Sequence, residues 1–215
     1  MYQFAGFAPD DFDIFLIPEF HDRMTAVRTH IRPKLAMIGD DLAPRLTELL
    51  RQPIFPHTAS HARRRVNPPD DTWVSFSRNE RGYKRFAHFE VGITLNYVFV
   101  RFVVKREGED DKPALMRHLR SQGEDAFRLS DPAPIYWYKD DHGVDPFPLS
   151  EITPAKVGEI IRHTDVKSHG FTVGLTFSRT DPVVASAALI ARTYNVIAHL
   201  SPLYAGAVPM EALSQ

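Results

Sequence analysis

Residues 54–105 constrain the fold most, because four stretches of strand-like composition follow one another there with only short turns between them. The stretches cover residues 54–58, 72–78, 87–95 and 97–105, and each is rich in β-branched or aromatic side chains. Turn-forming Asn, Pro, Asp and Gly residues fill the gaps at 67–71, 79–82 and Asn96. Strands joined by connections this short pair as antiparallel neighbours. The sequence therefore predicts an antiparallel sheet at the centre of the fold.

Side chains alternate along the fourth stretch, so it presents two different faces. One face carries Val98, Val100, Phe102 and Val104. The opposite face carries Phe99, Arg101 and Val103.

Helices are predicted on both sides of this β region. Apolar spacings of three or four predict a helix over 19–38, bent near Pro33 and ended at Gly39, and a second helix that starts at Asp40. Further helices are expected over 113–129, 153–164 and 182–200, and further strands over 135–138 and 171–177. One sheet with helices packed on a single face is an α+β architecture. We expect one domain spanning residues 1–215, with an order of elements that a helix-grip arrangement also requires.

Composition excludes several classes of protein. The 215 residues include no Cys, which excludes a disulfide scaffold, a thiolate zinc site and a cysteine nucleophile. No run approaches the roughly 18 apolar residues that a membrane-spanning helix needs. Residues 1–11 have neither a basic nor an apolar leader region and contain the acidic pair Asp10 and Asp11, so we expect a cytoplasmic protein with no membrane association.

Charge is distributed unevenly although the net charge is only −1. Residues 57–106 carry ten Lys or Arg and four acids, a net charge of +6, whereas the rest of the chain carries 16 and 23, a net charge of −7. A cationic segment of this kind attracts anionic partners. It is also, and more commonly, typical of a solvated sheet face that pairs with acidic helices.

The densest group of candidate binding residues lies in and beside the 57–85 region. We predict that it binds an anion through His57, His61, Arg63, Arg64, Arg81 and Lys84, with Trp73 among them. Arginine pairs with phosphate or carboxylate oxygens in a bidentate way and stays charged at any working pH. The partner would be an anionic small molecule or a short nucleic-acid segment, because aromatic rings beside cations also stack bases. A structural alternative is that Arg64 caps backbone carbonyls or pairs with Asp70 or Asp71 to fix the turn.

Other chemistries have weaker signals. On an extended strand His57 and His61 stand roughly 13 Å apart, at ~3.3 Å per residue, and no third ligand is close in sequence, so no metal site is predicted. No glycine-rich phosphate loop and no nucleophile elbow is present, and we expect no cofactor. Two further hypotheses stay open. One is a hydrolase-type enzyme in which a His acts as general base in an Arg-lined cleft. The other is a protein-interaction domain without a small-molecule site. The pattern indicates neither catalytic residues nor an oligomeric state.

The order of these motifs resembles the YktB-like family of uncharacterised bacterial proteins. The resemblance is carried by His57, His61–Arg64, Val66–Pro69, Asp71–Val74, Arg81–Lys84 and His88–Phe89, and near the N-terminus by Asp11–Phe12, Phe15, Ile17–Pro18, Arg23–Met24 and Arg32–Leu35. It covers roughly residues 10 to 106. It implies a cytoplasmic α+β domain of helix-grip or TATA-box-binding-protein-like architecture. It implies no activity, and a shared fold does not confer DNA binding.

Overall fold

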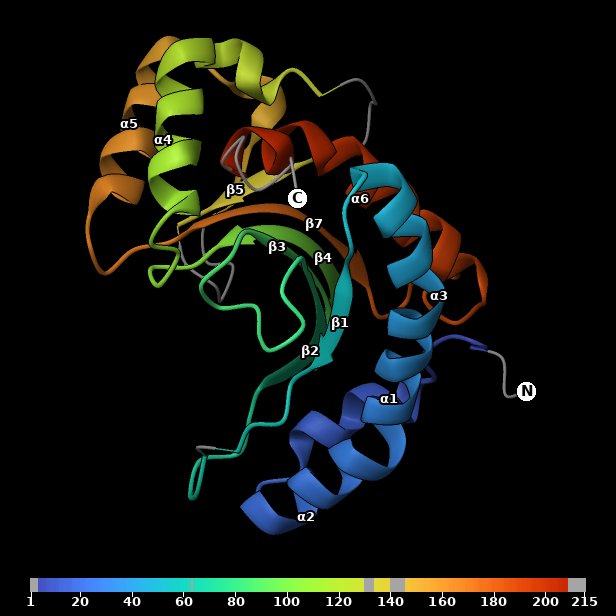
Figure 1. Cartoon of the computed structure of the whole chain (residues 1–215). Coiled ribbons are helices and arrows are strands. Elements are labelled where there is room, and N and C mark those ends of the chain that lie inside the picture. Colours follow the sequence, from blue (N-terminus) through green and yellow to red (C-terminus); the bar gives the residue numbers. More distant parts are fainter. Residues whose placement is uncertain (1–3, 63, 130–133, 140–145, 209–215) are drawn as a thin grey trace.

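The computed structural model describes residues 4–62, 64–129, 134–139 and 146–208, and its centre is a seven-stranded antiparallel sheet (Figure 1). The strands lie in the order β1-β2-β3-β4-β7-β5-β6. Their bounds are β1 Phe55–Thr58, β2 Asp71–Ser77, β3 His88–Thr94, β4 Tyr97–Val104, β5 Tyr136–Tyr138, β6 Phe147–Pro148 and β7 Phe171–Ser178. The four consecutive strands predicted from residues 54–105 are confirmed to within two residues at each end, and β6 was not predicted.

Six α-helices accompany the sheet in the described residues. They are α1 Pro9–Asp13, α2 Phe20–Ala26, α3 Arg32–Leu50, α4 Asp111–Gln122, α5 Pro154–Asp165 and α6 Ala188–Ala207. Shorter helical turns are η1 Ile14–Leu16, η2 Val27–Ile31, η3 Gly123–Phe127 and η4 Leu149–Glu151. The predicted α+β class, with an antiparallel sheet and helices against it, is therefore confirmed.

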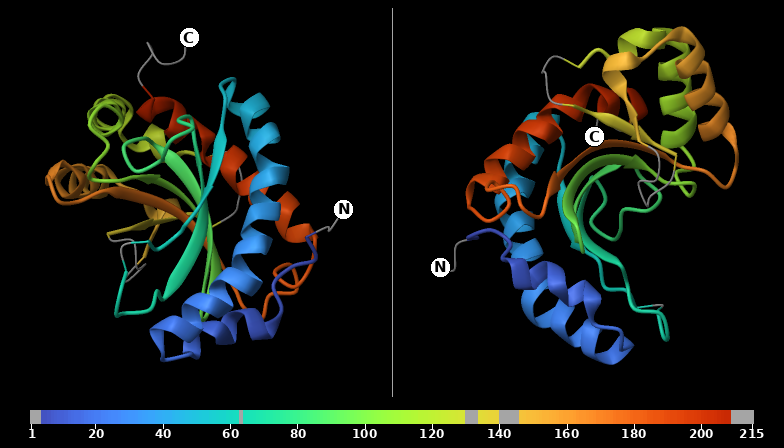
Figure 2. Two further views of the ribbon diagram at one scale, coloured as in Figure 1. Left: turned by 60° about the horizontal axis from the view of Figure 1, so that its bottom comes forward. Right: turned by 180° about the vertical axis from the view of Figure 1, so that it is seen from behind.

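The two faces of the sheet differ in chemistry and in cover. Val98, Val100, Phe102 and Val104 lie in the hydrophobic core, where α3 and α6 pack on the strands. Figure 2 shows that the sheet is curved and that the helices lie on its convex side. The concave side instead faces residues 78–87, the connection between β2 and β3 (Figures 1 and 2). A helix-grip label is compatible with this order of elements and stays a prediction.

The prediction that a helix ends at Gly39 is wrong. The chain stays helical from Phe20 to Leu50. The π-helical turn η2 ends at Ile31, two residues before Pro33, whose missing amide hydrogen interrupts the regular hydrogen-bond spacing. Gly39 lies buried inside α3, and a Cβ there would come within 3.0 Å of the Pro56 Cβ on β1. Glycine at this position lets helix and strand approach closely, and does not end the helix.

Gly39→Val is expected to lower the free energy of unfolding by about 1–3 kcal/mol, because the added methyl groups must displace β1. The matched control is Gly158→Ala on α5, where the new Cβ would meet only the flexible end of Arg162. That control should raise stability by about 0.5–1 kcal/mol through helix propensity. Urea denaturation measures both variants, and equal effects at the two sites would contradict the close-packing explanation.

The last helix starts and ends later than predicted. Residues 182–187 form turns because tertiary contacts hold them: the Phe7 amide donates to the Val184 carbonyl at 2.8 Å, and a Cβ on Gly6 would collide with the Ala185 backbone at 2.3 Å. The helix continues through Pro202, which cannot donate to the Ala198 carbonyl. The Ser201 hydroxyl donates to that carbonyl instead, at 2.7 Å, so the helix runs on to Ala207.

Two other helix boundaries need smaller corrections. The predicted helix over 113–129 is α4 followed by η3, because Gly123 takes a positive φ of 57° and ends the regular helix. The predicted helix over 153–164 is confirmed as α5, with Thr153 as its N-cap: its side chain accepts from the Lys156 amide at 3.2 Å.

Candidate functional site

The concave face of the sheet carries buried charged side chains in a single row. Strand register places Ser75, Glu90, Arg101 and Gly174 beside one another across β2, β3, β4 and β7. Glu90 is 6% exposed and Arg101 is 3% exposed. Burying charges is costly unless they are paired and hydrogen-bonded, so this row is a feature that the core alone does not require.

Glu90 lies at the centre of a polar cluster. Its Oε1 accepts a hydrogen bond from His88 Nε2 at 3.0 Å and pairs with Lys105 Nζ at 3.2 Å. Burial alone would raise the pKa of Glu90, but the charge of Lys105 and the hydrogen bond from His88 lower it to about 2. His88 also bonds through Nδ1 to the Phe86 carbonyl, at 2.7 Å. Both ring nitrogens of His88 therefore face oxygens that only accept hydrogen bonds.

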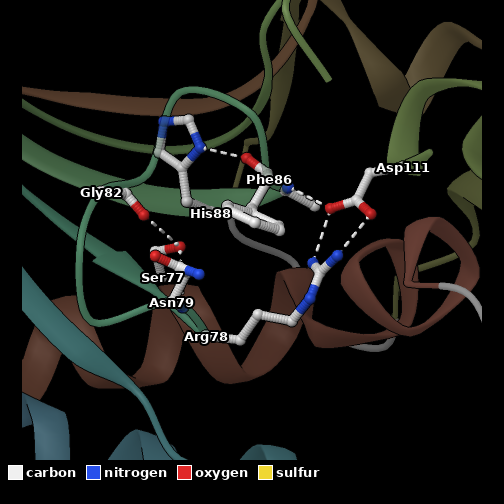
Figure 3. A network of polar contacts seen from close by, with 8 residues as sticks. Ser77, Arg78, Asn79, Gly82, Phe86, His88 and Asp111 are labelled. Carbon is white, nitrogen blue, oxygen red and sulfur yellow. Dashed lines mark hydrogen bonds and ion pairs between the residues drawn. The ribbon is translucent and has the colours of Figure 1, made fainter. Parts of the chain in front are cut away.

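Residues 78–87 cover this cluster and are tied down at several points (Figure 3). The Arg78 guanidinium forms a bidentate ion pair with Asp111, with both contacts at 2.6 Å, and Ser77 Oγ donates to the Gly82 carbonyl. Tyr83 then packs against His88 with ring centroids 5.0 Å apart. The cover of the polar cluster is thus a fixed loop.

Arg101 borders a hollow at the other end of the row. Its guanidinium lies over the Phe99 ring at 4.3 Å and over the Tyr138 ring at 4.9 Å. A Cβ on the neighbouring Gly174 would collide with the Val100 carbonyl oxygen at 2.1 Å and would lie 3.0 Å from Arg101 Cγ, so the glycine lets β7 approach β4 closely beside this side chain. The hollow beside it has a volume of about 540 Å³. Its described lining residues are Tyr97, Arg101, Pro134, Tyr136, Tyr138, Pro146, Leu175, Thr176, Phe177, Asp181 and Arg192.

Arg192 brings a second guanidinium to the hollow from a distant part of the sequence. It lies on α6 and is half-buried. Among the described residues it makes no hydrogen bond or ion pair. Asp181 is the one acidic residue among those that line the hollow and belong to the described chain. The hollow is therefore cationic, and its three tyrosines surround it with aromatic rings.

Three of the predicted binding residues, His57, His61 and Trp73, lie beside the Glu90 cluster. The His57 ring lies 5.9 Å from Tyr83, and its Nε2 bonds to the Asn79 carbonyl at 2.8 Å. Lys105 Nζ lies 5.6 Å from the Trp73 ring, and the His61 ring packs edge-on to Trp73 at 5.5 Å. His57, His61 and Trp73 thus share one contact chain with the cluster.

The predicted cationic side chains do not lie together at the Glu90 cluster. Arg64, Arg81 and Lys84 are exposed on the connecting loops, and Arg63 lies outside the described residues. Arg64 donates to the Pro68 carbonyl at 3.4 Å, as the structural alternative for this residue predicted, whereas Asp70 pairs with Arg23 at 3.2 Å. Whether these cations bind a ligand stays a prediction.

His61 has an unusual environment for a histidine. Its backbone takes a positive φ of 52°, and Nε2 lies 3.1 Å from Thr72 Oγ1. Burial, with the nearby charges of Arg64 and Arg32, lowers the pKa of His61 to about 4. The ring is therefore neutral at pH 7, and it is a weaker base than the ideal general base near neutral pH.

Sequence reasoning missed the residues that line the hollow. Arg101 was assigned to the face opposite Val98 and Val100, but alternation does not tell which face of a strand remains open. Tyr138 and Arg192 lie 37 and 91 residues further along the chain, so only the tertiary fold brings them to Arg101. Glu90 was counted only as one of four acids in the cationic segment.

Comparison with known proteins identifies relatives over most of the chain. A family model described as a domain of unknown function, DUF1054, matches residues 7–204. A UPF0637 protein of Bacillus cytotoxicus is 35% identical over 173 residues, which cover 79% of this chain and 81% of the relative. A UPF0637 protein of Oceanobacillus iheyensis is 32% identical over 201 residues, which cover 93% and 95% of the two chains. One of Bacillus velezensis is 44% identical over 98 residues, which cover 46% of this chain and 47% of the relative.

None of the helices in the described segments is long and apolar enough to cross a bilayer.

The family resemblance predicted from the motifs of residues 10–106 is confirmed and extends well beyond them, to residue 204. The chain therefore belongs to the DUF1054 family of uncharacterised bacterial proteins, whose relatives carry the name UPF0637.

Proposed function

We propose that this chain is a cytoplasmic binding protein that holds a phosphate- or carboxylate-bearing ligand in the hollow lined by Arg101 and Arg192. The observation that carries the proposal is that two arginines, Arg101 of β4 and Arg192 of α6, line the same hollow of about 540 Å³. That volume falls within the roughly 300–1,000 Å³ of small-molecule sites.

The chemistry of the lining suits an anion. Arg101 is held between two aromatic rings, so its orientation is fixed before a ligand arrives and little side-chain entropy remains to be lost. Arg192 can turn its donors to the ligand without breaking a hydrogen bond or ion pair to a described residue. Burial raises the pKa of Tyr138 to about 12, so its hydroxyl stays protonated and can donate a hydrogen bond.

The predicted hairpin residues have a supporting role in this proposal. Arg64, Arg81 and Lys84 are exposed on connections that lead to the concave face, where their charge would draw an anion towards it. We place this function before the hydrolase hypothesis, because His88 has both ring nitrogens bonded to acceptors and the pKa of His61 is about 4. The interaction-domain hypothesis has no support from an extended exposed apolar patch among the described residues: the large exposed apolar side chains are Leu16, Val66 and Val166, from three separate segments.

Arg192→Gln is expected to weaken the binding of pyrophosphate at least about tenfold, because one charge-assisted hydrogen bond contributes roughly 1.5–3 kcal/mol. Isothermal titration calorimetry at low ionic strength measures the affinity. Repeating it in roughly 0.5 M salt, where the Debye length is below about 5 Å, measures how strongly salt screens the binding. Arg101→Lys keeps the charge but loses the bidentate geometry, and it should weaken binding by a similar factor.

Arg64→Gln is the matched control, since it removes one guanidinium from the hairpin and not from the hollow. It should change the affinity less than about threefold, by long-range attraction alone. If Arg64→Gln abolishes binding while Arg192→Gln has no effect, the site is on the hairpin. If pyrophosphate does not bind to the wild type at all, the anion-binding proposal fails.

A further inference from the structure

We infer that the ligand of the Arg101–Arg192 hollow carries its anionic group on a planar aromatic ring, as a nucleoside monophosphate does. This inference rests on the proposed function and narrows the class of ligand. Its basis is that Tyr97 and Tyr136 line the same hollow as the two arginines.

Tyr97 and Tyr136 flank the hollow from two different strands. Tyr97 begins β4, and Tyr136 begins β5 on the far side of β7. Both are half-buried. Strand β5 pairs with β7 only from Thr172 to Gly174, so the hollow opens beside Leu175–Phe177, where this pairing has ended.

The rings of these two tyrosines differ from the other aromatic rings of the concave face. Phe99 and Tyr138 already have the Arg101 guanidinium on their faces, and Tyr83 packs on His57 and His88. Within the described chain, Tyr97 and Tyr136 contact neither an aromatic ring nor a cation. Two half-buried tyrosines without a ring or cation partner in the described chain therefore line the same hollow as the two arginines.

An aromatic ligand uses such faces better than a simple anion does. Stacking of one base on an aromatic side chain contributes roughly 1–3 kcal/mol, or about five- to 150-fold in affinity. The apolar side chains of Leu175 and Phe177 also line the hollow and would contact the ring of a ligand but not an inorganic ion. The volume of about 540 Å³ leaves room for a ring beside the anionic group.

The test compares AMP, adenosine and inorganic phosphate as probes, by calorimetry with the full chain at one ionic strength. AMP is expected to bind at least about tenfold more tightly than phosphate, and adenosine more weakly than AMP. Tyr136→Leu should reduce the affinity for AMP about fivefold or more without changing the affinity for phosphate. Tyr136→Phe keeps the ring and should retain the wild-type affinity for AMP. Tyr97→Leu repeats the test on the opposite strand if Tyr136→Leu does not fold.

The outcomes separate this inference from the proposed function. If AMP and phosphate bind equally and Arg192→Gln weakens both, the aromatic inference is overturned and the anion site stands. If no probe binds, both fail. A 5′-phosphorylated tetra-adenylate distinguishes the two sources of the same chemistry: tighter binding than AMP indicates the end of a nucleic acid, and weaker binding indicates a free nucleotide.

Discussion

Replacing Asp111 by alanine is expected to lower the free energy of unfolding by about 3–5 kcal/mol, the typical cost of breaking a buried ion pair from one side. The Asp111 side chain is fully buried, and both of its oxygens accept from the Arg78 guanidinium at 2.6 Å. One of them also accepts from the Ala87 amide. The substitution leaves the Arg78 charge, which is only 13% exposed, without its partner. Urea denaturation at pH 7 measures the loss.

The matched control is Asp110→Ala, which removes the neighbouring carboxylate. Asp110 is exposed, and its side chain makes no capping hydrogen bond to α4. Its substitution should change stability by no more than about 0.5 kcal/mol. A similar loss for both variants would show that general charge at the start of α4, and not the Arg78 pair, is the stabilising factor.

Glu90→Gln is expected to cost about 3 kcal/mol at pH 7 and progressively less in acid. The pKa of Glu90 is about 2 in the folded protein against an ordinary 4.5, and one pKa unit corresponds to about 1.4 kcal/mol. Because the folded-state pKa is lowered, the carboxylate contributes its full stability above pH 4.5. That contribution is lost as the pH falls from 4.5 to 2. Protonated Glu90 resembles glutamine, so the two proteins should converge near pH 2.

Denaturant titrations of wild type and Glu90→Gln at several pH values between 7 and 2 measure this convergence. Glu80→Gln is the control, since Glu80 is exposed on the connection between β2 and β3 and should show a small difference at every pH. A difference between wild type and Glu90→Gln that stays constant down to pH 2 would contradict the assignment of Glu90 as an ionised partner of His88 and Lys105.

Local patterns predicted the strands well and several helix boundaries poorly, for identifiable reasons. Alternation and turn residues are properties of neighbouring positions, so β1 to β4 could be located from the sequence. Gly39 resembles a helix terminator in sequence, but its role depends on Pro56, which reaches it only in the folded protein. The start of α6 likewise depends on Phe7 and Gly6, far away in the chain.

The sequence predicted the kind of candidate site, an anion site, but only part of its location. The excess of cations in residues 57–106 indicated an anion site, yet part of that excess serves ion pairs: Arg78 with Asp111, Arg85 with Glu109 and Lys105 with Glu90. Two of these acids lie outside the segment, so a charge count over the segment could not show the pairing. Arg192 could not be included, because no local pattern relates a residue on the last helix to the fourth strand.

The loop of residues 78–87 covers the concave face in place of a helix. Substitutions in this loop between its anchors are therefore separated in space from the residues of the hydrophobic core. The hydrophobic core is completed on the convex side, so altering the length or composition of the loop between its anchors leaves the interior packing intact. In related chains we therefore expect differences in length and composition to concentrate in this connection, on an unchanged scaffold.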